Sequence, residues 1–191
     1  MRERIELPKA YRLLNHGPTV LVSARHDGRS NVMAAAWAMP LDFNPPEVAV
    51  VIDKSTFTRT LIEASGRFAL QLPCRAQADL AYTLGSTSGR EVDKVAALGL
   101  AFLDEPEARS PLLEGCVGWL DCRLLPEPDV QQRHDLFLGE VEAAWADSRV
   151  FPQGRWQLQP GHDELRTLHH VAGGLFLSAS DPLQAQTLPL P

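Results

Sequence analysis

The stretch TVLVSARHDGRSNVMAAAW (residues 19–37) decides the fold class. Two apolar runs flank the pair Asp27-Gly28. Asp-Gly between two such runs is among the strongest short-range signals for a β-hairpin. The stretch therefore predicts two antiparallel strands joined by a tight turn.

The residues that follow predict more strands. In FNPPEVAVVID (43–53) we expect another hairpin, because Pro45-Pro46 excludes a helix and the residues after it form a continuous apolar run. The stretch RFALQLP (67–73) predicts a short strand that ends at a proline.

Short helices separate these strands. In STFTRTLIEASG (55–66) apolar residues recur at helical spacing, with Ser55 as a suitable N-cap and Gly66 as a suitable C′ residue. RAQADLAYTLG (75–85) and VDKVAALGL (92–100) show the same spacing and predict two more helices.

The last third of the chain returns to strands. GCVGWLDCRLLPE (115–127) alternates between apolar and polar residues, and HDLFLGEVEAAWAD (134–147) is its expected antiparallel neighbour. LHHVAGGLFLS (168–178) predicts a terminal strand interrupted by a Gly-Gly kink.

Strands outnumber helices, they come in hairpins, and the helices are short insertions between them. That order favours a mainly β fold, an antiparallel barrel with short helices packed at its rim, over a doubly wound parallel sheet. The pattern GxGxxG does not occur in the sequence, which argues against a Rossmann dinucleotide site. We expect a single domain over residues 1–178 and a polar, Pro-rich tail over residues 179–191.

The composition excludes several classes of protein. The chain has 191 residues, of which 45% are hydrophobic and 22% charged, and a net charge of −6. A nucleic-acid surface needs a basic stripe, which an acidic chain without a long Lys/Arg run does not offer. The apolar runs are too short to span a bilayer, and the first residues lack the apolar core of a signal peptide. We therefore expect a cytoplasmic protein that binds neither nucleic acid nor membrane.

Cysteine and histidine spacing predicts no metal site. Cys74, Cys116 and Cys122 are an odd number without CxxC spacing, and their apolar surroundings predict buried thiols. His169 and His170 are adjacent, so on a strand their side chains would face opposite sides. No HxH, HExxH or GxSxG spacing occurs, so a hydrolase is not predicted either.

Three polar loops interrupt the apolar scaffold and are candidates for a ligand site. In the first, RSNVMAAAW (29–37), three consecutive alanines would let a flat ligand approach the backbone, and Asn31 offers an amide. The same alanines would also fit a crowded barrel interior, so the pattern leaves both interpretations open.

The second loop, DKSTFT (53–58), combines three hydroxyl groups and Lys54 with the start of a helix. The free N–H groups of a helix N-terminus attract anions. Ordinary N-capping by Ser55 or Thr56 would explain the same residues without any ligand. This loop also leaves both interpretations open.

The third loop, LGSTSGREVDK (84–94), combines two glycines and three hydroxyl groups with Arg90 and Lys94. Its backbone N–H groups could form an anion-binding concavity. Alternatively, Asp93 caps a helix or pairs with Lys94, and taken alone the loop favours this simpler explanation. Two such loops in one small acidic protein are harder to explain by capping alone, so the anion site stays open as a hypothesis.

These segments resemble a known family. NVMAAAWAMPLDFNPPEVAVVIDKSTFTRTLIEASGRFALQLP (31–73), LGSTSGREVDK and HDLFLGEVEAAW follow in the order found in the flavin reductase-like proteins. These proteins have an FMN-binding split barrel and include flavoredoxins and the small reductase components of two-component flavin monooxygenases. The resemblance covers about residues 10–178. It implies an antiparallel split barrel, FMN rather than FAD, NAD(P)H as co-substrate, a homodimer, and a monooxygenase or redox protein as partner.

The family pattern, carried over residue by residue, implies a flavin site. The first loop would run along the isoalloxazine ring, the second would hold the ribityl chain and phosphate, and the third would close the phosphate end from the same or a neighbouring subunit. The residues so implied are Asn31, Val32, Met33, Ala34, Ala35, Ala36, Trp37, Asp53, Lys54, Ser55, Thr56, Thr58, Ser86, Ser88, Gly89, Arg90 and Lys94.

One departure from the family concerns the nicotinamide. Many members carry G-D-H ahead of the F-x-G-E-V strand, a motif associated with nicotinamide binding, and here only His134 of Gln132-Arg133-His134 matches. The resemblance implies an NAD(P)H:flavin oxidoreductase that moves a hydride from nicotinamide C4 to flavin N5, with His134 as the candidate catalytic residue. The alternatives are a non-catalytic electron carrier of flavoredoxin type and a flavin-free binding barrel.

Overall fold

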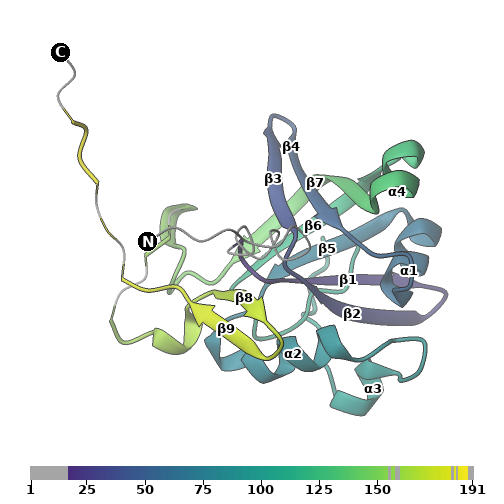
Figure 1. Cartoon of the computed structure of the whole chain (residues 1–191), viewed down its shortest axis with the longest axis horizontal. Coiled ribbons are helices and arrows are strands. Elements are labelled where there is room, and N and C mark those ends of the chain that lie inside the picture. Colours follow the sequence, from purple (N-terminus) through teal and green to yellow (C-terminus); the bar gives the residue numbers. More distant parts are fainter. Residues whose placement is uncertain (1–16, 155, 158–159, 182, 184, 189–191) are drawn as a thin grey trace, which may run out of the picture.

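The computed structural model describes residues 17–154, 156–157, 160–181, 183 and 185–188 (Figure 1). Residues 1–16, for which the sequence predicts no signal peptide, lie outside the described residues, as does part of the predicted tail. No helix in the described ranges is both long and apolar enough to cross a membrane.

One antiparallel sheet dominates the described part of the chain. Its strand order is β2-β1-β5-β6-β7-β4-β3, and every neighbouring pair is antiparallel. The predicted first hairpin is confirmed, because Asp27 and Gly28 both have positive φ angles, of 47° and 74°, as a tight hairpin turn requires. The strands are β1 (Val20–His26), β2 (Arg29–Ala35), β3 (Ala38–Phe43), β4 (Pro46–Val51), β5 (Arg67–Leu72), β6 (Gly118–Leu125) and β7 (Leu136–Ala146).

The sheet curls into a split barrel. Strands β2 and β3 are its two edges, yet only Ala36 and Trp37 join them in sequence. Two residues cannot span a flat seven-stranded sheet, so its edges have to approach each other. Side chains from β1, β4, β5 and β7 accordingly meet in one apolar core, with Phe68 and Phe137 fully buried. The predicted antiparallel split barrel is therefore confirmed.

Short helices cover the barrel, as predicted. Helix α1 packs on β1, β2 and β5, and α2 packs on β2 over a second apolar core that includes Leu84. Gly66 ends α1 in the left-handed conformation, with a φ of 69°, but the N-cap is Thr56 and not Ser55. The helices are α1 (Phe57–Ser65), α2 (Ala78–Ser86), α3 (Lys94–Leu98) and α4 (Pro128–His134), with 3-10 turns η2 (Arg75–Gln77), η3 (Pro152–Gly154) and η4 (Asp163–Leu165).

The C-terminal third differs from the sequence prediction in two places. Strands β6 and β7 are antiparallel neighbours as expected, but His134 lies at the end of α4 and not in the strand. The predicted kinked strand over residues 168–178 is instead a hairpin of β8 (Leu168–Ala172) and β9 (Leu175–Ser178). The glycine pair makes its turn, because Gly173 has a φ of 54° that reverses the chain direction.

The three cysteines behave as predicted. Cys74, Cys116 and Cys122 are all buried, and within the described residues they are free thiols. No group of three or more possible metal ligands occurs in the described part of the chain.

Candidate functional site

A pocket of about 700 Å³ opens where the barrel splits, beside the link between β2 and β3. The alanine stretch of the first loop forms one wall, and residues from the α4–β7 corner and from the β8–β9 hairpin form others. Its lining residues include Met33, Ala34, Ala35, Ala36, Trp37, Asp53, Tyr82, Gly85, Ser86, His134, Asp135, His170, Gly173 and Phe176. The structure thus brings His134 next to the alanine stretch, although about a hundred residues separate them in sequence.

A second pocket of about 240 Å³ adjoins the first, with Met33, Ala34, Gly85 and Ser86 lining both. Its walls come from the start of α1 and from the loop after α2, and they are rich in hydroxyl groups. They include Asn31, Ser55, Thr56, Thr58, Ser86, Thr87, Ser88, Gly89 and Lys94. The second and third polar loops of the sequence therefore face each other across one small cavity.

The N-terminus of α1 opens toward this small pocket. The Ser55 hydroxyl and backbone N–H both donate to Asp53 Oδ1, at 2.6 and 2.7 Å, and these bonds lower the pKa of Asp53. The Thr56 hydroxyl donates to the carbonyl oxygen of Asp53 at 2.8 Å. Among the described residues, N-cap Thr56 makes no side-chain bond to the first turn, so simple capping is the wrong explanation for these hydroxyls. Thr56, Phe57 and Thr58, at the start of α1, line this pocket, so the positive end of the helix dipole lies beside it.

Lys94 places a buried positive charge in the same pocket. Its side chain is 2% exposed, and Nζ donates to the carbonyl oxygens of Leu84 at 2.8 Å and Thr87 at 3.0 Å. Asp93 caps α3 by accepting from Ala96 N at 3.1 Å, so the predicted capping is confirmed. No carboxylate of the described residues lines this pocket beside Lys94, and burial lowers the pKa of its ammonium to about 8. A buried cation without a counter-charge is costly for a protein, and groups with strongly shifted pKa values are frequent at functional sites.

Arg90 fastens the two polar loops to each other. Its Nε donates to Ser55 O at 3.0 Å, and its Nη2 donates to Thr60 Oγ1 at 3.0 Å and to Thr56 O at 3.4 Å. Lys54 points elsewhere, because its Nζ donates to Gln132 O at 2.6 Å. Both cations therefore hold loops in place here, and the predicted contact of either with a ligand stays a prediction.

Asn31 and Gly89 close the far end of the small pocket. The Asn31 amide is buried and donates to Thr58 Oγ1 at 2.8 Å. A Cβ added at Gly89 would lie 2.5 Å from Asn31 Oδ1, so only glycine fits there without moving the amide. Val32, between two pocket-lining residues, is fully buried in the core formed with α2. In the predicted site, Val32 would therefore meet a ligand only through its backbone atoms in β2.

Several walls of the large pocket have no signal in the sequence that predicts them. Tyr82 comes from the middle of α2, and His170 and Phe176 come from a hairpin that the sequence indicates only as a broken strand. None of these residues belongs to a polar cluster. The Gly173-Gly174 pair is the one sequence signal for this hairpin, because two adjacent glycines predict a chain-reversing turn as readily as a kink.

Comparisons with known proteins identify relatives of this chain and of its fold. Residues 12–168 match the family described as the flavin reductase like domain. The chain is similar to an FMN-binding domain of a flavin reductases-like enzyme from Shewanella baltica OS155, with 46% identity, a TM-score of 0.86, and coverage of 95% of this chain and 96% of that one. It is also similar to the flavoredoxin of Desulfovibrio vulgaris (Miyazaki F), with 25% identity, a TM-score of 0.80 and 97% coverage of each chain. A flavin reductase of Pseudomonas putida is 28% identical over 122 residues, which are 64% of this chain and 68% of that protein.

Proposed function

This chain belongs to the family of flavin reductase-like domains, and on that premise we propose that it binds FMN and is an NAD(P)H-dependent flavin reductase. The observation that carries the proposal is the buried ammonium of Lys94 in a hydroxyl-lined pocket at the N-terminus of α1. A phosphate group satisfies the ammonium, the hydroxyl groups and the helix N–H groups at once.

The two adjoining pockets fit the parts of FMN. The larger one has a flat wall of small side chains, which suits a planar tricyclic ring, and the smaller one has donors for a single phosphate at the end of a ribityl chain. The shared residues Gly85 and Ser86 lie where ring and chain would join. The donor set recognises a phosphate and not an adenine, which supports FMN over FAD.

The side chains of this site would bind and orient, since the redox chemistry is that of the cofactor. When bound, FMN supplies an N5 atom that accepts a hydride from C4 of a reduced nicotinamide. Strand β2 is an edge of the described sheet, so the outward N–H and C=O groups of residues 31–35 are available to the polar edge of the ring. His134, at the mouth of the larger pocket, would place the nicotinamide by a hydrogen bond to its amide. No acid or base from the protein is needed for this transfer.

A non-catalytic electron carrier of flavoredoxin type is the second candidate. Gln132 and Arg133 replace the glycine and aspartate that precede the histidine in many reductases of the family. In the structure Gln132 lies in α4, and its carbonyl oxygen holds Lys54. A protein that takes electrons from a redox partner would not need a nicotinamide pocket.

An absorbance spectrum of the purified protein, before and after addition of NADH or NADPH without oxygen, tests these candidates. A yellow protein that bleaches supports the reductase. A yellow protein that stays yellow but is reduced by a redox protein supports the carrier. A colourless protein that does not take up added FMN contradicts both and leaves a flavin-free barrel. The reduced protein would then be tested for transfer of electrons to a monooxygenase or another redox protein.

The double substitution of Ser55→Ala and Thr56→Ala should weaken FMN binding at least tenfold, about 1.4 kcal/mol. Both hydroxyls line the small pocket, and their bonds to Asp53 order the loop in front of α1. A titration that follows quenching of flavin fluorescence measures the change. Unchanged affinity would show that these hydroxyls serve only the loop.

Substitution of His134→Ala should slow reduction by nicotinamide about tenfold and leave FMN bound. The reason is that His134 lines the larger pocket but not the smaller one, where the phosphate would bind. Stopped-flow absorbance gives the rate of bleaching, and a flavin titration gives the affinity. An unchanged rate would remove His134 from its proposed role.

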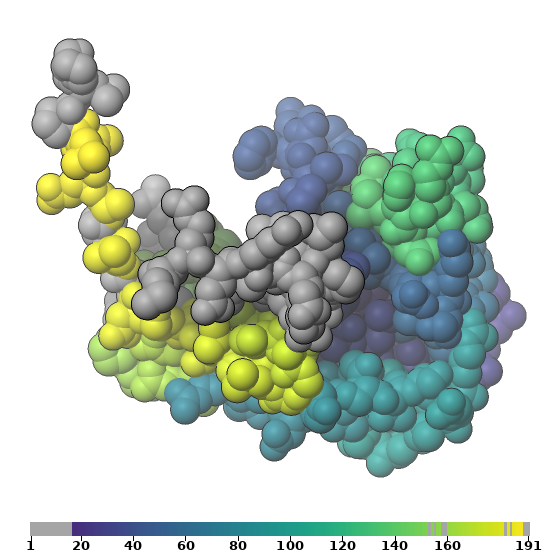
Figure 2. Space-filling model, viewed as in Figure 1, coloured from purple at the N-terminus to yellow at the C-terminus, as the bar shows by residue number. Residues whose placement is uncertain are grey.

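We further propose a homodimer formed through β3. This edge strand and the link before it expose large apolar side chains, with Phe43 exposed to 94%. Figure 2 shows that the β3–β4 hairpin projects from the body of the molecule. Trp37 belongs both to this apolar surface and to the larger pocket, so a partner seated on β3 would also border the flavin site.

A further inference from the structure

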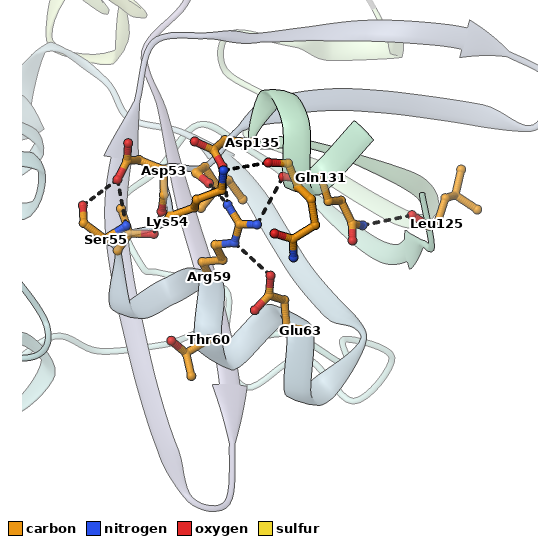
Figure 3. A network of polar contacts seen from close by, with 12 residues as sticks. Asp53, Lys54, Ser55, Arg59, Thr60, Glu63, Leu125, Gln131 and Asp135 are labelled. Atoms are coloured by element: carbon orange, nitrogen blue, oxygen red, sulfur yellow. Dashed lines mark hydrogen bonds and ion pairs between the residues drawn. The ribbon is translucent and has the colours of Figure 1, made fainter. Parts of the chain in front are cut away.

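Arg59 is a buried arginine that joins three separate parts of the fold. Its side chain extends from α1 and the residue is 5% exposed. Nε donates to Glu63 Oε1 at 2.8 Å on the helix itself, and Nη1 donates to Asp135 Oδ1, at the end of α4, at 2.6 Å (Figure 3). Nη1 and Nη2 also donate to the carbonyl oxygens of Ile52 and Gln131, both at 3.2 Å.

The aspartate that receives Arg59 holds an unusual backbone conformation. Asp135 has a φ of 55°, in the left-handed region that few residues other than glycine adopt. It ends α4, donating its N–H to Gln131 O at 3.1 Å and accepting from Ile52 N at 2.8 Å. Because the chain reverses at this residue, its conformation sets where His134 lies. Both His134 and Asp135 line the larger pocket.

Lys54 holds the same corner from the side of the small pocket. Its Nζ donates to Gln132 O at 2.6 Å and lies 3.6 Å from Asp135 Oδ1. Figure 3 shows Lys54 and Arg59 converging on Asp135 from the loop before α1 and from α1 itself. The corner is thus attached to the segment that opens the small pocket, more than 70 residues away in sequence.

We propose that Arg59 and Asp135 form a positioning pair, which fixes the α4–β7 corner so that His134 faces the second ligand of the larger pocket. The proposal deepens the function proposed above and rests on it, since the second ligand is taken to be a reduced nicotinamide. Neither residue takes part in the transfer itself. Their ion pair sets the geometry of His134, and a guanidinium with four hydrogen bonds suits this role because its planar fork holds several acceptors in fixed directions.

The substitution Asp135→Asn is the sharpest test, because asparagine tolerates the left-handed conformation and only the charge is lost. In the FMN-free protein we expect it to shift the Cε1 proton resonance of His134 and to leave that of His26 in place. In the FMN-loaded protein we expect the KM for NADH or NADPH to rise about tenfold, while kcat and the FMN dissociation constant each change less than threefold. The substitution Arg59→Met should cause the same changes in the His134 resonance and the KM, and Arg59→Lys should cause smaller ones.

The ion pair between Arg67 and Glu142, 2.8 Å long and half-exposed on β5 and β7, supplies matched controls. Arg67→Met and Glu142→Gln remove the same charges and should leave the His134 resonance and the KM unchanged. If Asp135→Asn lowers the melting temperature without moving either readout, the network only stabilises the fold and the proposal is wrong. If the wild-type protein is not reduced by nicotinamide, the proposed function fails, and the His134 resonance still decides whether the pair positions this corner.

Discussion

Substitution of Lys94→Met should weaken the binding of FMN about a hundredfold and leave the affinity for riboflavin within about threefold. Riboflavin has the same ring and ribityl chain but no phosphate, so it serves as the matched ligand. Removing a hydrogen bond to a charged group typically costs about 1.5–3 kcal/mol, and a hundredfold change is about 2.7 kcal/mol. Lys94 should fall at the upper end because its ammonium is buried and the pocket around it has no carboxylate among the described residues. Fluorescence titrations with both flavins give the two affinities.

The stability of the Lys94 variant separates binding from folding. A buried ammonium without a counter-charge costs desolvation energy, so its replacement by an apolar side chain should change the free energy of unfolding by less than about 1 kcal/mol or raise it. The carbonyl oxygens of Leu84 and Thr87 lose a donor, which opposes this gain. If FMN and riboflavin affinities fall equally, Lys94 only holds the loop after α2, and the phosphate would have to bind elsewhere.

The same residue makes FMN affinity depend on pH. Burial lowers the pKa of Lys94 to about 8, so above this pH the unliganded pocket loses its positive charge. A phosphate dianion favours the ammonium, so FMN affinity should fall by up to about tenfold per unit above pH 8, while riboflavin affinity stays level. Fold stability changes with pH in the opposite direction. Between pH 8 and the ordinary lysine pKa, the unfolded chain binds more protons than the folded chain, so the free energy of unfolding rises with pH.

How far the sequence predicts this fold depends on whether the signal is local. Asp27-Gly28 and Gly66 predict the turn and the helix end that the structure has, because a left-handed backbone at these positions follows from the residue types themselves. The sequence does not predict helix α4, because it is short and polar and packs on β7, and because the carbonyl oxygen of Gln131 accepts a hydrogen bond from Arg59, a residue far away in sequence. No window of sequence around α4 contains that information.

The site residues also divide into those with a local signal in the sequence and those without one. The hydroxyl clusters at residues 53–58 and 84–88 were recognisable because their chemistry is visible in the sequence. The sequence does not predict which of the two lysines is buried. Lys94 is buried and Lys54 points toward α4, but both stand in polar stretches, and only the packing of the fold distinguishes them. Walls such as Tyr82 and Phe176 carry no polar signal, and the packing of α2 and of the separate β8–β9 hairpin brings them to the pocket.

Substitution of Phe43→Glu should separate the proposed dimer, raising its dissociation constant at least a hundredfold. An exposed apolar edge strand is a hazard for aggregation unless something covers it, and a second copy of the chain covers β3 without any new partner. In a symmetric dimer the same residue occurs twice at the interface, so two charges would be buried. About 1.4 kcal/mol for each charge already gives a hundredfold effect. Sedimentation velocity over a range of protein concentrations measures it.

Leu98→Glu places the same charge on a half-exposed leucine of α3, away from β3, and should leave the dimer intact. A wild-type chain that sediments as a monomer, or a Phe43→Glu variant that remains a dimer, would falsify the proposed interface. The flavin provides an independent check. Because Trp37 borders both β3 and the larger pocket, loss of the partner should weaken FMN binding, and the affinity of Phe43→Glu should then improve as the protein concentration rises. An affinity that stays equal to that of the wild type at every concentration would mean that each chain completes its own flavin site and that a partner on β3 adds nothing to it.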